Sequence, residues 1–281
     1  MKTLVVGASG RVGGAAVELL RERGDSVTAL TRSADAPLPA DVERYVADLT
    51  DISALSQLPF SDATFLVFPS VTADPYAAEI ADALAARTGH IVYLSAHGAA
   101  DADPEGEGIM PSHARVEREL KRTGVRRTFL RSSGFAANTL GWAPYVKAGQ
   151  PIRGIAADAR RALIHERDLA AVGVHEMSYV AGDLEQILHL TGPEVMTQRE
   201  YADALSSILG GDYPFVELSD DDAARELFPD APPAMVRSIL EGQRRMIAEP
   251  EPRTDTVAQV LGRPATPYSQ WVRDHQGDFT A

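Results

Sequence analysis

The N-terminal stretch constrains the fold of this chain more than any other. It reads K-T-L-V-V-G-A-S-G-R-V-G-G over residues 2–14. A short apolar run at residues 4–6 stops at Gly7, glycines return at Gly10 and Gly13, and apolar residues then recur at the spacing of a helix. The pattern predicts a buried strand, a tight turn and a helix.

Each glycine has a physical role in such a turn. The first permits a sharp exit from the strand, the second lets backbone N–H groups approach a pyrophosphate, and the third lets the helix pack closely on the strand. The free N–H groups and the positive dipole end of the helix then bind the anion. The commonest fingerprint is G-x-G-x-x-G, so a glycine-rich turn without a ligand stays as the alternative. The dinucleotide-binding residues predicted here are Gly7, Ser9, Gly10, Arg11, Val12 and Gly13.

The first half of the chain alternates between strand and helix patterns. Strands are predicted at residues 26–31, 43–47, 63–68, 91–95 and 128–131, and helices include residues 75–87 and 112–122. Strands joined by helical crossovers form a parallel sheet wound on both faces. Ligands of such sheets lie at the carboxyl ends of the strands.

The residues that follow the second and third strands are expected to meet the adenosine half of the ligand. An acidic residue there would bind the 2′-hydroxyl of NAD, but this chain has Thr31 and Arg32. Arg32 can pair with the 2′-phosphate of NADP, or it is a solvated surface arginine. Asp48, beside Leu49, either accepts a hydrogen bond from adenine or caps the helix that begins near Asp51.

Further candidates follow the fourth and fifth strands. Phe68 and Pro69 end the fourth strand and are predicted to contact the cofactor. Ser95 and His97 end the fifth strand. They contact nicotinamide or substrate, or they only shape the turn after the strand.

The regular alternation is lost after residue 131. Phe135 and Asn138 lie in this irregular segment and are predicted to contact the substrate, although ordinary packing explains the aromatic residues there equally well. Short strands are expected at residues 162–164 and 186–190, and later helices at 197–209, 220–228, 233–247 and 256–261. We predict a nucleotide-binding core at 1–131, a mixed segment at 132–193 that returns strands to the core and lines the pocket, and a substrate-binding cap at 194–281.

Composition excludes several classes of function. A formal net charge of -13 opposes nucleic-acid binding, and the absence of cysteine excludes disulfides and thiolate sites. The seven histidines show no H-x-H or H-E-x-x-H pairing, so we predict no metal site. No apolar run approaches the roughly 20 residues that span a bilayer, and no signal peptide is recognisable. A cytoplasmic protein without membrane contact is expected.

Several motifs resemble one family. They are G-A-S-G-R-V-G at the start, L-S-A-H-G-A from Leu94, H-A-R-V-E-R-E-L-K-R-T-G-V from His113, I-H-E-R-D-L-A from Ile164 and L-T-G-P-E-V-M-T from Leu190. In this order they resemble the NmrA-like, atypical short-chain dehydrogenase/reductase proteins. The resemblance implies a Rossmann-type NAD(P)-binding domain with a small, mostly helical C-terminal cap. It also implies NADP(H) as the usual cofactor, with NAD(H) less favoured.

The chain departs from the wider family at its catalytic motif. Typical members carry Tyr-x-x-x-Lys, in which the tyrosine protonates the substrate carbonyl. The aligned segment here is I-M-P-S-H, and His113 stands where the lysine would be. His113 is therefore the catalytic candidate, holding the nicotinamide ribose or relaying a proton, or it is a polar surface residue at a helix start.

The expected function is an NADPH-dependent reductase that delivers hydride to a small, activated and conjugated acceptor of quinone or enone type. Such acceptors are strong electrophiles that do not need a placed acid. Two alternatives stay open: a redox-sensing regulator that binds the nucleotide without turnover, and an enzyme of the same fold that catalyses isomerisation or dehydration. A homodimer is a further expectation.

Overall fold

The computed structural model describes residues 1–69, 73–178 and 183–280, and these fall into two compact units. The first unit contains Met1–Ser132 and Glu166–Leu190, and the second contains Ser133–His165 and Thr191–Ala281. In the described part of the chain, no helix is both long and apolar enough to cross a membrane.

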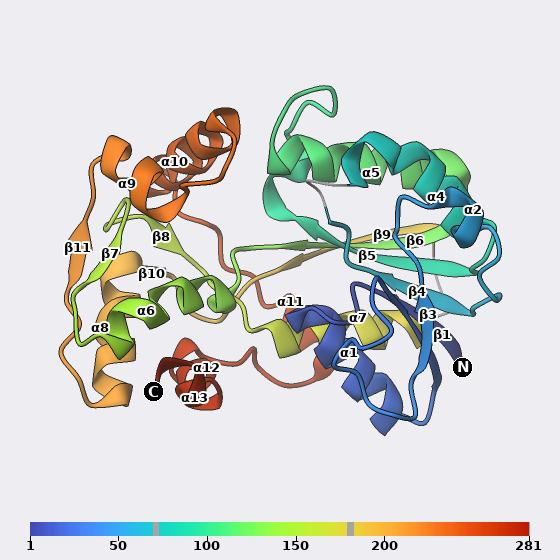
Figure 1. The fold of residues 1–281 in the computed structure, drawn as a ribbon, viewed down its shortest axis with the longest axis horizontal. Helices are drawn as coiled ribbons and strands as arrows, with labels where there is room; N and C mark the ends of the chain where they lie inside the picture. The colour runs from blue at the N-terminus through green and yellow to red at the C-terminus, as the bar shows by residue number, and fades with distance from the viewer. Residues whose placement is uncertain (70–72, 179–182, 281) are drawn as a thin grey trace. The chain divides into compact units, whose positions relative to one another are not determined.

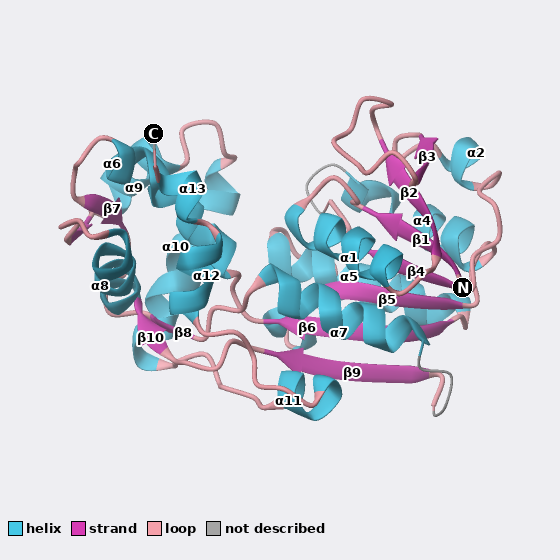
Figure 2. Cartoon of the chain, turned by 90° about the horizontal axis from the view of Figure 1, so that it is seen from below, coloured by secondary structure: helices cyan, strands magenta, loops and turns pink. Residues whose placement is uncertain are grey.

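The first unit is built on a parallel sheet of seven strands (Figures 1 and 2). Their order across the sheet is β3 (Glu43–Val46), β2 (Ser26–Thr31), β1 (Lys2–Val6), β4 (Ala63–Leu66), β5 (His90–Ala96), β6 (Arg126–Ser132) and β9 (Glu185–Leu190). Every neighbouring pair in this sheet is parallel. Chain order reverses between β1 and β4, which is the place where doubly wound sheets bind ligands.

Helices cover both faces of this sheet, as Figure 1 shows. One face carries α1 (Arg11–Glu22) and α7 (Glu166–Ser178), and the other carries α2 (Ile52–Leu55), α4 (Ala77–Ala85) and α5 (Ile109–Thr123). Because both faces are covered, β4 is buried along its whole length, Thr64 included. Gly173 lets α7 approach β4 closely, since a Cβ there would lie 2.2 Å from Cε2 of Phe65.

The predicted fold class is confirmed: the chain forms a Rossmann-type doubly wound sheet and a mostly helical C-terminal part. Residues 26–31 match the predicted strand in both bounds. β4 ends two residues before the predicted bound, although the Val67 N–H still donates to the Val6 carbonyl at 3.1 Å. α5 begins at Ile109, three residues before the prediction, because Pro111 is accommodated in its first turn.

The second unit has small sheets and many helices. β8 (Arg160–Arg161) pairs with β10 (Met196–Thr197), and β7 (Ile152–Gly154) pairs with β11 (Phe215–Glu217). Its helical elements are η3 (Ala136–Trp142), α6 (Ala143–Lys147), α8 (Gln198–Leu209), α9 (Asp220–Leu227), α10 (Pro233–Ala248), α11 (Thr256–Leu261), α12 (Tyr268–Asp274) and α13 (Gln276–Phe279). In its core Tyr268 stacks on Trp271 and meets Tyr201 edge to face. The strand expected at residues 162–164 was wrong, since the ladder lies at β8 and Ile164 makes only an isolated bridge to Phe135.

The compact units divide the chain at other points than the ranges expected from the sequence. Residues 133–165 belong to the helical unit, whereas residues 166–190 return to the sheet as α7 and β9. The return follows from parallel pairing, because β9 can join β6 in parallel only after a crossover helix. That residues 132–193 line the substrate pocket stays a prediction.

Candidate functional site

The glycine turn after β1 has the geometry of an anion cradle. Gly7 has φ of +79°, a left-handed conformation that side chains disfavour. A Cβ on Gly13 would lie 2.1 Å from the Gly7 carbonyl oxygen, so helix and strand meet there only because no side chain intervenes. Gly10 caps α1 without any side-chain hydrogen bond, and Ser9, Gly10 and Arg11 are exposed. The first N–H groups of α1 are thus presented to a ligand.

Val12 and Gly13 belong to the same cradle but are buried. The Val12 side chain packs into the core, so this residue can offer a ligand only its backbone N–H. The cradle fits the pyrophosphate of a dinucleotide, because it presents backbone donors and has no room for side chains.

The end of β2 places Arg32 beside Asp48. The Arg32 side chain is exposed, while Thr31 is buried and donates its hydroxyl to the Ser33 carbonyl. Hydrogen bonds from the Thr50 hydroxyl and backbone lower the pKa of Asp48, and the nearby Arg32 charge contributes. Helix α2 is capped by Asp51, whose Oδ1 accepts the Ala54 N–H at 3.0 Å, so the alternative of Asp48 as the helix cap was wrong.

Three of the remaining cofactor candidates differ in exposure. Leu49 and Phe68 are buried in the apolar core, and Pro69 is exposed. They follow β3 and β4, strands that flank the β1–β2 pair, so the sheet brings their carboxyl ends to one edge. The order of strands therefore places all predicted cofactor residues of the first unit along that edge.

His113 lies on α5 with its ring against the buried Tyr93 of β5. The Tyr93 hydroxyl and His113 Nδ1 are 2.6 Å apart. Burial raises the pKa of Tyr93 and lowers the pKa of His113 to about 4, although Glu117 and Asp74 act against the second shift. Tyr93 therefore keeps its proton and donates to Nδ1, which places the proton of the neutral imidazole on Nε2.

Behind this pair lies a buried ion pair. Arg131 of β6 donates to Glu117 of α5 through Nη2 and Nε, at 2.6 and 2.9 Å. The Ser95 hydroxyl donates to the same carboxylate at 2.7 Å, and the Ser132 hydroxyl donates to the Ser95 carbonyl. The Ser95 hydroxyl is thus a buried link between strand and helix, which is a different role from an exposed contact with a cofactor.

His97 contacts a residue that the sequence does not single out. It begins η2 (His97–Ala100), the short helix after β5, and its Nδ1 lies 3.2 Å from Nδ1 of His189 in β9. The two ring centroids are 5.2 Å apart and the planes are inclined by 76°. Burial, the His97 ring and the Arg131 charge lower the pKa of His189.

The two other substrate candidates lie in the second unit. Phe135 is half-buried and its carbonyl accepts the N–H of Asn138 at 3.0 Å, while Asn138 is exposed. A parallel bridge to Ile164 holds Phe135 at the start of η3. Their contact with a substrate stays a prediction.

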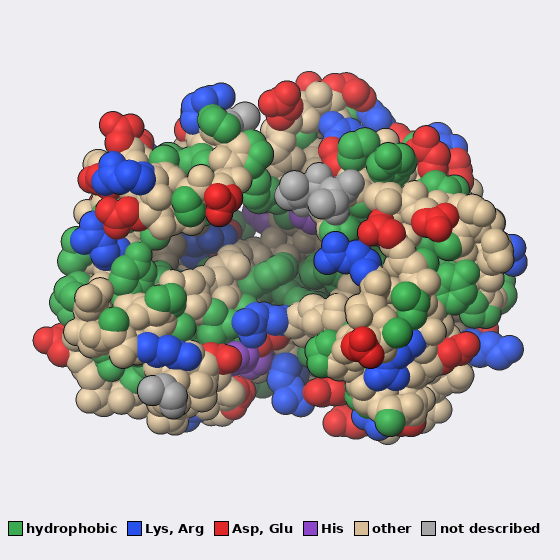
Figure 3. Space-filling model, in the orientation of Figure 1, with side chains coloured by type: hydrophobic (Ala, Val, Ile, Leu, Met, Phe, Trp, Pro, Cys, Tyr) green, Lys and Arg blue, Asp and Glu red, His purple; other side chains and the backbone are tan. Residues whose placement is uncertain are grey.

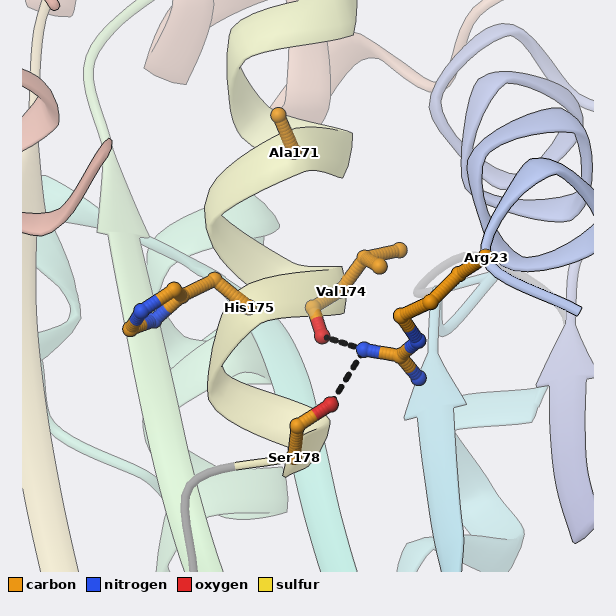
Figure 4. Close-up of a pocket in the computed structure, with 5 residues that line it drawn as sticks. All are labelled: Arg23, Ala171, Val174, His175 and Ser178. Carbon is orange, nitrogen blue, oxygen red and sulfur yellow. Dashed lines mark hydrogen bonds between the residues drawn. The ribbon is translucent and has the colours of Figure 1, made fainter. Parts of the chain in front are cut away.

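A pocket of about 380 Å³ lies elsewhere in the first unit, lined by Arg23, Ala171, Val174, His175 and Ser178. Figure 4 shows Arg23 directed at the Val174 carbonyl and the Ser178 hydroxyl, while His175 points away from it. Arg23 follows the C-terminal end of α1, and the cradle lies at the other end of that helix, roughly 18 Å away at 1.5 Å per residue. The pocket is separate from the cradle, and Arg23 there ties α1 to α7.

Fold and cradle together define a dinucleotide-binding α/β protein. Residues 7–176 match the family model described as NAD(P)H-binding, and the chain belongs to this family. The predicted resemblance to NAD(P)-binding reductases is confirmed at that level, as is NAD(P)H as the cofactor class.

Two curated relatives align over nearly the whole chain. One is the (4-alkanoyl-5-oxo-2,5-dihydrofuran-3-yl)methyl phosphate reductase of Streptomyces griseus, 32% identical over 98% of this chain and 98% of its own length. Another is the NAD(P)H azoreductase of Xenophilus azovorans, 26% identical over 99% of each. Both names are those of reductases, in agreement with the prediction of an NADP-dependent oxidoreductase.

A solved structure with the same fold is the NADPH-dependent quinone oxidoreductase of Escherichia coli in complex with NADPH. The TM-score is 0.79 at 22% identity, over 97% of this chain and 99% of that one.

Figure 3 shows acidic side chains dispersed among basic ones over the face drawn, a distribution unlike the basic stripe that nucleic acids require.

Sequence reasoning missed four residues near the carboxyl ends of β5, β6 and β9. They are Tyr93, Glu117, Arg131 and His189. Each lies inside a strand or helix that the pattern predicts, so each reads as ordinary core or surface. A polar residue within a buried strand, such as Tyr93, was the available signal.

Proposed function

We propose that this protein is an NADPH-dependent reductase of small, activated acceptors such as quinones, azo compounds and enones. The observation that carries the proposal is the glycine cradle of an NAD(P)H-binding family member whose whole length aligns with two proteins named as reductases. The bound dinucleotide supplies a hydride, and the chain itself supplies binding, orientation and a shaped site.

Arg32 supports the choice of NADPH over NADH. Its guanidinium is exposed at the end of β2, where the adenosine ribose of a dinucleotide lies in this fold. No acidic side chain closes the strand to bind a 2′-hydroxyl. Arg32 also offsets the charge of Asp48, which would otherwise repel a 2′-phosphate.

His113 is proposed to hold the nicotinamide half of the cofactor through Nε2–H. Its Nδ1 accepts a hydrogen bond from the Tyr93 hydroxyl, so the ring is a fixed donor with one tautomer. A pKa of about 4 keeps it neutral near pH 7, which favours a holding role over a proton relay by an imidazolium.

The preference for activated acceptors follows from the acid that the chain lacks at the aligned position. Residues 109–113 contain no tyrosine, and Tyr93 is fully buried with its proton directed at His113. A plain ketone needs a placed acid as hydride arrives, whereas a quinone, an azo compound or an enone can accept hydride first and take up its proton afterwards. Phe135 and Asn138 are proposed to contact the acceptor.

The test is NADPH oxidation by purified protein with a panel of a quinone, an azo dye, an enone and a plain ketone. The expected result is turnover with the first three, slow or no reaction with the ketone, and lower efficiency with NADH. Tight NADPH binding without oxidation by any acceptor would overturn the reductase and favour a redox-sensing regulator. Conversion of a substrate without net NADPH oxidation would favour an isomerase or a dehydratase.

A further inference from the structure

The His97–His189 contact restricts how many protons the two rings can hold. A hydrogen bond between the two Nδ1 atoms, 3.2 Å apart, needs one N–H and one lone pair. A neutral pair satisfies this requirement, and so does a pair with one additional proton. Two additional protons would set two N–H groups against each other, so the pair exchanges a single proton while the contact lasts.

The pair lies at the ligand-binding edge of the sheet. Ser95, Arg131 and His189 are in register across β5, β6 and β9. His97 comes directly after Ala96, the last residue of β5. Since all these strands are parallel, their carboxyl ends share the edge that carries the glycine cradle after β1. Both rings are half-buried, so both are shielded from solvent in part.

The surrounding charges assign the donor and the acceptor of this contact. Arg131 from β6 and His97 from η2 act on His189 with the same sign as its burial, and Glu117 from α5 opposes them, so the pKa of His189 is lowered. Glu117 is itself neutralised by Arg131. His189 is therefore the acceptor of the contact and His97 the donor through Nδ1–H, which leaves Nε2 of His97 on the side of its ring away from His189.

Other groups at this edge are committed elsewhere. Tyr93 donates to His113, the neutral His113 ring has its Nδ1 occupied, and the Ser95 hydroxyl donates to Glu117. The histidine pair brings two ionisable rings, both half-buried, together at the ends of β5 and β9.

We infer that His97 is the proton donor for the reduced acceptor and that His189 positions it. This inference rests on the proposed function. Hydride from NADPH forms the new C–H or N–H bond, NADPH becomes NADP⁺, and the acceptor becomes an anion. His97 Nε2–H then donates its proton to that anion, the neutral pair keeps its Nδ1 hydrogen bond, and solvent returns the proton. The acceptor class that benefits most is one whose reduced anion is strongly basic, such as an enone or an azo compound.

The first experiment compares His97→Asn with wild type on an enone, an azo dye and a quinone. We expect kcat with the enone and the azo dye to fall by about 10²-fold, the typical contribution of a general acid, with a smaller loss for the quinone and unchanged NADPH affinity. In wild type we expect kcat to fall as pH rises, because the histidine pair loses its proton. This falling limb of the pH profile should be absent in the variant. The matched control is His175→Asn, which changes a histidine on α7 outside this edge.

The second experiment tests the positioning role. His189→Leu removes the acceptor of the shared hydrogen bond, so we expect the falling limb of the pH profile to shift to lower pH. His189→Asn keeps an acceptor oxygen and restores the limb. A merely structural role of His189 would lower kcat without moving the limb.

NMR of the histidine ring nitrogens gives a readout without turnover. The expected result is one proton taken up by the two rings together and a shared Nδ1 hydrogen bond that is lost in His97→Asn. Independent titration of both rings, or an unchanged pH profile in His97→Asn alongside an active wild type, overturns this inference and leaves the reductase intact. Absence of turnover with every acceptor overturns the proposed function and, with it, the role of the pair.

Discussion

Two stretches of the same sheet edge offer different kinds of groups to a ligand. At β1 the glycine turn offers backbone N–H groups, and its geometry depends on the absence of side chains at Gly7 and Gly13. At β5, β6 and β9 the edge is made of side chains, each held by another: Tyr93 with His113, and His97 with His189.

The difference separates binding from chemistry. A pyrophosphate is common to all dinucleotides, and a backbone cradle suits it because the backbone changes little with sequence. An acceptor is particular to one enzyme, and side chains that differ among proteins of one fold are suited to select it. Four tests, from the largest expected effect to the smallest, sharpen or break this contrast.

Removing the buried charge of Glu117, which lies behind the Tyr93–His113 contact, should have the largest effect on stability. Glu117→Gln leaves the Arg131 charge uncompensated in a pair whose side chains are 4% and 10% exposed. We expect a loss of about 3 to 5 kcal/mol in the free energy of unfolding, measured by urea denaturation. The control Glu226→Gln opens the solvent-exposed pair with Arg153 and should cost less than about 1 kcal/mol. Equal losses in both variants would contradict the view that the buried Glu117–Arg131 pair stabilises this edge of the sheet.

Acid should destabilise the protein through His113. Its pKa is about 4 in the folded state and near 6.5 when unfolded, so the unfolded chain binds the proton first as pH falls. The stabilisation is complete above pH 6.5 and is lost as pH falls towards about 4, with at most about 3 kcal/mol from this ring. Tm measured across this range should fall less steeply in His113→Asn. The buried His90 acts in the same direction, so some slope will persist in the variant.

A methyl group in the cradle should weaken NADPH binding. In Gly13→Ala the new Cβ would meet the Gly7 carbonyl oxygen at 2.1 Å, so the turn must move. We expect about 2 kcal/mol of destabilisation and at least a tenfold weaker Kd for NADPH, measured by fluorescence titration and thermal unfolding. The same substitution at Gly242, within α10 and with open space around it, should preserve binding and stabilise the helix slightly. Unimpaired binding in Gly13→Ala would disprove the backbone cradle.

Cofactor preference should show the smallest change. Arg32→Glu replaces a cation with an anion beside Asp48, which repels a 2′-phosphate and can accept from a 2′-hydroxyl. The ratio of the NADPH and NADH affinities should shift towards NADH by at least tenfold, roughly 1.4 kcal/mol. Arg237→Glu changes the net charge equally at an exposed position of α10 and should leave the ratio alone. An unchanged ratio in Arg32→Glu would remove the phosphate assignment.

The parts predicted correctly share a local origin. The cradle is contained in residues 7–13, and the strand at 26–31 follows from β-branched residues between a helix stop and a polar loop. One error arose where distant pairing decides the outcome. Residues 160–161, rather than 162–164, form a ladder because Met196 and Thr197 lie against them. Another was local: the alternative of Asp48 as a helix cap failed because Asp51, three residues on, is placed to accept the Ala54 N–H.

The sequence by itself determined the nucleotide-binding class, because three glycines and a helix start act through the backbone of one continuous turn. Only the tertiary structure decided which side chains contact His97 and His113. His189 lies 92 residues from His97, and Tyr93 lies 20 residues from His113, so only the order of parallel strands brings each pair within hydrogen-bonding distance. A proton position depends on such partners, and no spacing along a chain encodes them.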